Sequence, residues 1–123
     1  MSQTISITID VAELTKALNF YVQALSCQLK NKQSEDWAVI SIGGLDINLI
    51  EKKEGTIAAA KHKRSYKRHW TPVHLDFNVD SVEASMALVK NNGGTVEGHV
   101  VSEDSAFAHC SDPFGNGFCI VGS

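Results

Sequence analysis

The chain has 123 residues, of which 43% are hydrophobic and 20% are charged, and its formal net charge at pH 7 is −3. This length suits one globular domain that closes its own core. No segment approaches the roughly 20 apolar residues of a membrane span, and the N-terminus lacks the features of a secretory signal. We therefore expect a cytoplasmic protein that does not associate with a membrane, and the weak net charge argues against binding to nucleic acid.

Cysteine usage points to the same compartment. Cys27, Cys110 and Cys119 are an odd number, and no two of them have CxxC spacing. This pattern argues against a disulfide framework and against a structural zinc site. We expect three reduced thiols.

The first half of the chain combines the hydrophobic periods of strands and of a helix. Residues 4–11 alternate polar and β-branched residues, which predicts a strand whose Ile5, Ile7 and Ile9 face a helix. Apolar residues then recur at spacings of three and four over residues 12–25, which is typical of a helix. Three further strands fit residues 27–32, 36–43 and 45–51, with a Gly-Gly turn before the last.

The second half repeats this order. Residues 71–79 alternate, with Val73, Leu75 and Phe77 on the face expected to lie under a helix. A helix is predicted over residues 81–94, ended by a Gly-Gly pair. Three strands follow, and they are expected over residues 95–101, 105–111 and 117–121.

The two halves therefore align as an internal duplication. Ser6 falls on His74, and Asn48 falls on Cys119. We predict a single α+β domain of two tandem βαβββ modules, residues 1–51 and 71–123, joined by a linker over residues 52–70. Five Lys and Arg residues crowd residues 61–68 of this linker, which we interpret as a solvated segment. An interaction module that binds protein or nucleic acid through this basic run is the alternative from another functional class.

Several segments carry a family resemblance. The strand and helix around ALNFY, the HLDFNV strand, the helix ending in GG and the closing DPFGNGFCIV over residues 112–121 appear in that order. Together they resemble the glyoxalase/bleomycin resistance/dioxygenase (vicinal oxygen chelate) superfamily. The resemblance implies a curved mixed sheet around a cleft, with the helices outside, and it implies a homodimer. It leaves open whether the two modules pair within one chain or across the dimer.

The resemblance also implies where a metal would bind. The four cleft positions that hold ligands in metal-dependent members correspond here to Ser6, Asn48, His74 and Cys119. A hydroxyl and an amide donate too little charge to hold a divalent cation, so we expect no metal and no cofactor. The alternative is a divalent-metal lyase, isomerase or dioxygenase of the same superfamily that recruits unusual donors. The candidates for such donors are Asp10, Asp46, Asp76, His99 and His109.

No nucleophile motif and no phosphate-binding loop is present in the sequence. His74 and Asp76 lie two residues apart on one strand face, where they can share a ligand proton. An indole such as that of Trp37 offers a flat surface for an aromatic or cationic ligand. We therefore predict a metal-independent, bleomycin-resistance-like protein that binds a small organic molecule, cationic or aromatic, in its cleft. The predicted ligand-binding residues are His74, Asp76, Asn48, Trp37, Cys119 and Ser6.

Overall fold

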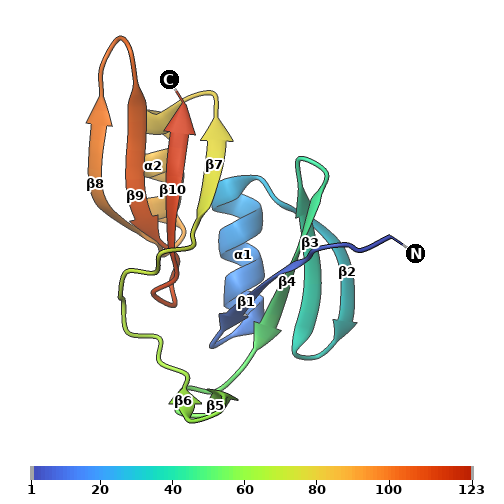
Figure 1. Cartoon of the computed structure of the whole chain (residues 1–123). Coiled ribbons are helices and arrows are strands. Elements are labelled where there is room, and N and C mark those ends of the chain that lie inside the picture. Colours follow the sequence, from blue (N-terminus) through green and yellow to red (C-terminus); the bar gives the residue numbers. More distant parts are fainter. Residues whose placement is uncertain (1, 123) are drawn as a thin grey trace.

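The computed structural model describes residues 2–122, which form an α+β fold with two four-stranded mixed sheets (Figure 1). The first sheet has the strand order β1-β4-β3-β2, and the second has the order β7-β10-β9-β8. In each sheet the opening strand pairs in parallel with the closing strand, and the other pairings are antiparallel. Neither helix within residues 2–122 is long and apolar enough to cross a membrane.

Both modules follow the predicted βαβββ order. The first consists of β1 (Ile7–Val11), α1 (Leu14–Leu25), β2 (Gln28–Ser34), β3 (Trp37–Ile42) and β4 (Leu45–Glu51). The second consists of β7 (Leu75–Val79), α2 (Val82–Asn91), β8 (Thr95–Val101), β9 (Ala106–Ser111) and β10 (Gly117–Gly122). The predicted fold class is therefore confirmed.

Strand register supports the internal duplication. Ile7 lies opposite Ile47 in the parallel ladder of the first sheet, and Leu75 lies opposite Phe118 in that of the second. Ser6 and His74 therefore both immediately precede an opening strand. Asn48 and Cys119 occupy the same place on the two closing strands, as the alignment of the halves predicted.

The apolar strand faces lie under the helices and join in one buried core. Phe77, Phe118 and Ile120 of the second sheet belong to this core together with residues of both helices. Helix α1 contacts α2, and its Phe20 makes an edge contact with Phe118 of the second module. The opposite faces of the strands carry the polar side chains, so the sheets present them away from the helices.

Two of the residues predicted to be buried are not. Ile5 is 88% exposed and Val73 is 87% exposed, whereas Phe77 is buried and Ile7, Ile9 and Leu75 pack partly against the core. The apolar alternation begins two residues before either ladder does, because β1 starts at Ile7 and β7 at Leu75. Ile5 and Val73 therefore lie outside the part of each strand that packs against the core.

The linker also contains structure that its composition did not predict. Strands β5 (Ile57–Ala59) and β6 (His62–Lys63) form a small hairpin. Arg64 closes it, because its backbone N–H donates to the carbonyl of Thr56 at 2.7 Å. The Arg64 guanidinium pairs with Asp10 of β1 at 2.8 Å, which ties the hairpin to the first module.

Candidate functional site

A polar cluster lies on the helix-free face of the second module. Cys119 on β10 is the cross-strand partner of both Asp76 on β7 and His109 on β9, so the three side chains share this face. Cys119 Sγ lies 3.3 Å from His109 Nδ1 and 3.9 Å from His74 Nδ1. His74 Nδ1 lies 3.3 Å from Asp76 Oδ1. We call these four residues the thiol cluster.

The environment of Cys119 differs from that of the other two thiols. Cys27 and Cys110 are buried in the hydrophobic core, and burial raises the pKa of each thiol to about 11. Burial also raises the pKa of Cys119, and the negative charge of Asp76 raises it further, whereas Arg68 opposes both effects. Burial and the negative charge of Asp76 therefore both favour the protonated form of the Cys119 thiol.

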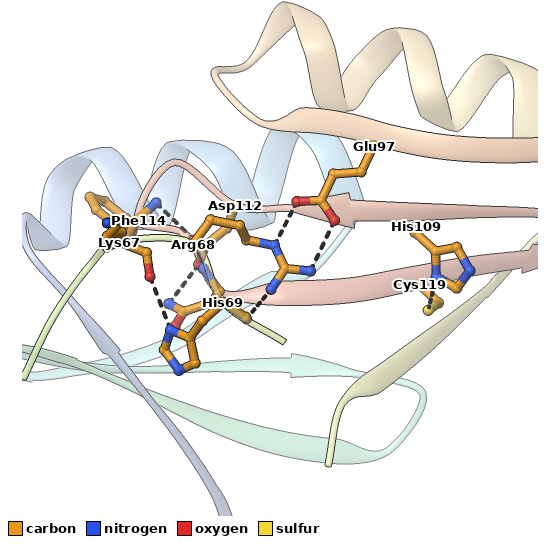
Figure 2. Close-up of polar contacts among 9 residues, drawn as sticks. Lys67, Arg68, His69, Glu97, His109, Asp112, Phe114 and Cys119 are labelled. Atoms are coloured by element: carbon orange, nitrogen blue, oxygen red, sulfur yellow. Dashed lines mark hydrogen bonds and ion pairs between the residues drawn. The ribbon is translucent and has the colours of Figure 1, made fainter. Parts of the chain in front are cut away.

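The end of the linker runs along the same face (Figure 2). Arg68 makes a two-point ion pair with Glu97 on β8, with nitrogen–oxygen distances of 2.6 and 2.9 Å, and it also donates to the carbonyl of His69. Its guanidinium covers Gly117, where an added Cβ would lie 2.7 Å from a guanidinium nitrogen. The Trp70 indole, 61% exposed, stands 5.2 Å from the His74 ring.

The first module presents a separate polar pair at the equivalent place. Trp37 Nε1 donates to Asn48 Oδ1 at 2.9 Å, and Asn48 Nδ2 donates to the carbonyl of Ile7 at 3.3 Å. Ser6 is exposed just before β1. Of the six residues predicted to bind ligand, the fold thus brings His74, Asp76 and Cys119 into one cluster and Trp37 and Asn48 into another.

A pocket of about 540 Å³ lies between the two modules. It is bounded by β1 on one side and by β7 and the start of β10 on the other, with Tyr21 of α1 also contributing. Its apolar lining includes Ile7, Ile9, Leu75, Phe77 and Phe118, and its polar lining includes Thr8, Asp10, Arg64, His69, His74 and Asn116. His74 therefore belongs both to this pocket and to the thiol cluster.

The turn at residues 112–116 fixes one end of the pocket. Asp112 is 3% exposed, and its carboxylate accepts hydrogen bonds from the backbone N–H groups of Phe114 and Asn116 and from the Tyr21 hydroxyl. Burial raises the pKa of Asp112, while these hydrogen bonds oppose the increase. Asn116 Nδ2 donates to the carbonyl of Asp10 at 3.0 Å, so the turn of the second module holds the opening strand of the first.

Sequence reasoning missed the contribution of the linker. Arg64 lines the pocket and Arg68 covers the second module, yet both appeared only as members of a basic run. Their partners Asp10 and Glu97 are 54 and 29 residues away. The charge pattern alone gave no signal for pairings at such separations.

Solved structures share this fold. The hypothetical protein SA1046 from S. aureus has 25% identity and a TM-score of 0.73, and the match covers 100% of this chain and 99% of that one. The fosfomycin resistance protein FosX from Listeria monocytogenes has 18% identity and a TM-score of 0.73, with 100% and 94% of the two chains covered. A mutant of FosX, also at 18% identity, TM-score 0.73 and coverages of 100% and 92%, is complexed with Mn(II) and 1S,2S-dihydroxypropylphosphonic acid.

The residues at the four positions implied by the family resemblance fit a hard divalent cation such as Mn(II) poorly. The side-chain oxygen of Asn48 accepts a hydrogen bond from Trp37, and its side-chain nitrogen donates one to the carbonyl of Ile7. Ser6 offers a neutral hydroxyl, and Cys119 offers a soft sulfur where hard ions prefer oxygen. His74 is the one standard ligand among the four, so these positions do not make a Mn(II) site.

The sequence itself also assigns the chain to a family. No curated protein matches it significantly. The sequence profile of the glyoxalase-like domain matches residues 6–121, which spans both modules and the linker. Because this match covers nearly the whole chain, the chain belongs to the glyoxalase-like domain family, as the resemblance implied.

Proposed function

We propose that this protein binds a small organic molecule in the pocket between its two modules, and that binding does not require a divalent metal ion. The observation that carries the proposal is the pocket itself. Its volume of about 540 Å³ lies within the range of about 300–1,000 Å³ typical of small-molecule sites. Its lining combines an apolar wall with a few polar groups, which is the usual composition of such sites.

The polar groups favour an aromatic or cationic ligand. Arg64 is neutralised by its ion pair with Asp10, so it adds little net positive charge to the pocket. Outside the pocket lining, but next to His74, stand the 53% exposed side chain of Asp76 and the exposed indole of Trp70. A carboxylate attracts a cation, and an indole face stacks on an aromatic ring or a cation. We propose that the ligand places its aromatic or cationic group here.

Metal independence is supported by the donor chemistry of this chain. A ligand held through a metal would need an ion fixed by several charged or imidazole donors. In the first module, the family resemblance places such donors at the positions of Ser6 and Asn48. The Asn48 oxygen already accepts a hydrogen bond from Trp37. We propose that His74 contacts the ligand directly.

We also propose that the protein is a cytoplasmic homodimer. Strands β1 and β7 are edge strands of their sheets, and unpaired edges favour association with another chain. The exposed Ile5 and Val73 lie immediately before these edges, where a second copy would cover them. The thiols of Cys27, Cys110 and Cys119 are free, which suits a reducing compartment.

A thermal-shift screen of aromatic and cationic compounds with metal-free protein tests the proposal. We expect at least one compound to raise the melting temperature in proportion to the logarithm of its concentration, and its affinity to be the same with a chelator or with added Mn(II). His74→Ala should weaken binding by about 1–3 kcal/mol if the imidazole makes a buried hydrogen bond to the ligand.

His99→Ala is the matched control, because His99 is an exposed histidine on β8 outside the pocket lining. Its affinity should equal that of the wild type. Binding that occurs only after Mn(II) is added would overturn metal independence. Equal affinities for the wild type and His74→Ala would remove His74 from the site.

A further inference from the structure

A second pocket lies at the other end of β7 from the pocket described above. Its volume is about 370 Å³, and its lining comes from the end of α1, the end of β7 and the start of α2, so both modules contribute to it. Among the described residues, Phe77 alone lines both pockets, and its side chain is buried. The two pockets are therefore separate sites, and we call the second one the helix-side pocket.

The apolar part of the helix-side pocket suits one small ring. Ala24 and Leu25 of α1 and Phe77 of β7 line it and are buried, and Ile42 and Val79 add further apolar surface. Its volume is near the lower end of the range of about 300–1,000 Å³ that is typical of small-molecule sites. An aromatic ring placed here would pack against the Phe77 side chain, and aromatic rings attract each other in edge and offset arrangements. The pocket therefore fits a ligand with a compact, one-ring body.

The charges around the helix-side pocket favour a cation. Asp80 is the one ionisable side chain in its lining, which contains no Lys, Arg or His among the described residues. Leu25 and Ser26 bring the C-terminal end of α1 to the pocket, and the last turn of this helix contains no basic residue. The carbonyl groups at a helix C-terminus carry partial negative charge. Both features attract a positively charged group.

The start of α2 has the opposite polarity, but two residues reduce its effect. Ser81 caps the helix by accepting a hydrogen bond from the backbone N–H of Ala84 at 3.2 Å. Glu83 supplies a negative charge in the first helical turn. Ser85 and Asn78 also line the pocket, and a hydroxyl and an amide oxygen can both accept hydrogen bonds from an ammonium group. A protonated amine therefore matches the polar part of the pocket better than an anion does.

We propose that the helix-side pocket binds a small primary amine that carries a single apolar ring. The ammonium group pairs with the carboxylate of Asp80, and the ring packs against Leu25 and Phe77. A neutral alcohol of the same shape lacks the charge, and a carboxylate of the same shape is repelled by Asp80. This site lies outside the pocket of the proposed function and does not depend on ligand binding there.

Titration of isotope-labelled protein with benzylamine, followed by the amide chemical shifts in nuclear magnetic resonance spectra, tests the site directly. We expect saturable shifts centred on residues 24–26 and 77–85. The dissociation constant of benzoate should be at least about tenfold higher than that of benzylamine, because like charges repel, and that of benzyl alcohol should lie between them. Shifts that do not saturate, shifts confined to the lining of the first pocket, or an equal affinity for benzoate would overturn the proposal.

A substitution that fills the pocket separates this site from nonspecific binding. Ala84→Phe should raise the dissociation constant of benzylamine at least about tenfold, because Ala84 lines the pocket and the added phenyl ring would occupy it. Ala84 is exposed, so the fold should be unchanged. Ala87→Phe is the matched control, since Ala87 is also an exposed alanine of α2 but does not line the pocket.

A second variant tests the charge. Asp80→Asn keeps the size of the side chain and should remove the preference for benzylamine over benzyl alcohol. Asp104→Asn is its control, because Asp104 is an exposed aspartate in the loop before β9, outside the pocket. If Asp80→Asn fails to fold, the comparison of Ala84→Phe with Ala87→Phe still decides. Benzylamine affinity unchanged in Ala84→Phe or lost equally in Ala87→Phe, or a preference for the amine retained in Asp80→Asn, would overturn the assignment.

Discussion

The hydroxyl of Tyr21 on α1 donates a 2.7 Å hydrogen bond to Asp112 Oδ2, in the turn before β10. The two residues are 91 positions apart, and both are almost fully buried. This hydrogen bond joins the helix of the first module to the turn of the second. The same turn holds the carbonyl of Asp10 through Asn116, so the pair also sets the distance between the two walls of the pocket.

Tyr21→Phe should therefore destabilise the protein. The substitution keeps the ring, which makes an edge contact with Phe20, but removes one donor from a buried carboxylate. A hydrogen bond to a charged group contributes about 1.5–3 kcal/mol, and we expect a loss of that size in the free energy of unfolding measured with urea. Tyr66→Phe is the control, because the Tyr66 hydroxyl donates to the carbonyl of Lys52 at an exposed place. Equal stabilities for Tyr21→Phe and the wild type would contradict this role.

Close packing makes a second prediction at Gly94. A Cβ added there would lie 2.6 Å from Phe20 Cε1, 2.8 Å from the Ser111 carbonyl oxygen and 2.8 Å from a Val89 methyl group. Gly94→Ala should cost about 1–3 kcal/mol, because both a backbone atom and core side chains must shift. In Gly98→Ala the new methyl group would have no neighbour within 4 Å, so the free energy of unfolding should not fall. An unchanged free energy of unfolding in Gly94→Ala would contradict this prediction, because the junction of α2 and β8 would then accommodate the added methyl group without cost.

The Arg68–Glu97 ion pair predicts a pH dependence of stability. Hydrogen bonds from Arg68 lower the pKa of Glu97 in the folded protein. The resulting stabilisation is fully present above the unfolded-state pKa of about 4.3 and is lost as the pH falls through the lower folded-state pKa. Because both side chains are about one-third exposed, we expect Glu97→Gln to cost at most about 1 kcal/mol at pH 7.

This difference in unfolding free energy between the wild type and Glu97→Gln should shrink as the pH is lowered below about 4. Urea unfolding at neutral and acidic pH measures it directly. Glu103→Gln, which alters an exposed glutamate before β9, should show no such convergence. If the difference in unfolding free energy between the wild type and Glu97→Gln stays constant at acidic pH, Arg68 does not stabilise the ionised form of Glu97.

Sequence periodicity predicted most of the fold, because alternation and helical spacing report directly on which side chains face the core. Alternation also placed His74 and Asp76 on one strand face, and the family resemblance implied that His74 and Cys119 lie in one cleft; the structure brings all three together. Periodicity failed where apolar alternation continues beyond the hydrogen-bonded ladder, as at Ile5 and Val73. Alternation shows a preference for extended backbone but not where pairing begins.

The linker escaped prediction for a different reason. The ion pair of Arg68 with Glu97 and the packing of its guanidinium on Gly117 depend on which residues the two folded modules bring together. A run of basic residues is compatible with many pairings, and only tertiary structure selects one. Tertiary structure also separates the predicted ligand-binding residues into two groups. Trp37 donates a hydrogen bond to Asn48 within the first module and does not reach the thiol cluster.

The exposed residues before β1 and β7 give a last prediction, which concerns self-association. Ile5 and Val73 are the most exposed of the large apolar side chains, and each continues an edge strand whose outer hydrogen-bonding groups have no neighbour in its own sheet. Covering these two exposed side chains with a second copy would remove apolar area from water. Sedimentation of the wild type at micromolar concentrations should therefore show a homodimer.

Val73→Lys should shift this protein toward monomer, because the ammonium group would have to leave water when the copies associate. Since Val73 is 87% exposed within one chain, the substitution should leave the fold of the monomer unchanged. Leu88→Lys is the control, as Leu88 is a 41% exposed apolar residue on α2, away from the two edges. A monomeric wild type would contradict the homodimer. A dimer weakened by Leu88→Lys but not by Val73→Lys would instead place the interface on the helices and away from the strand edges.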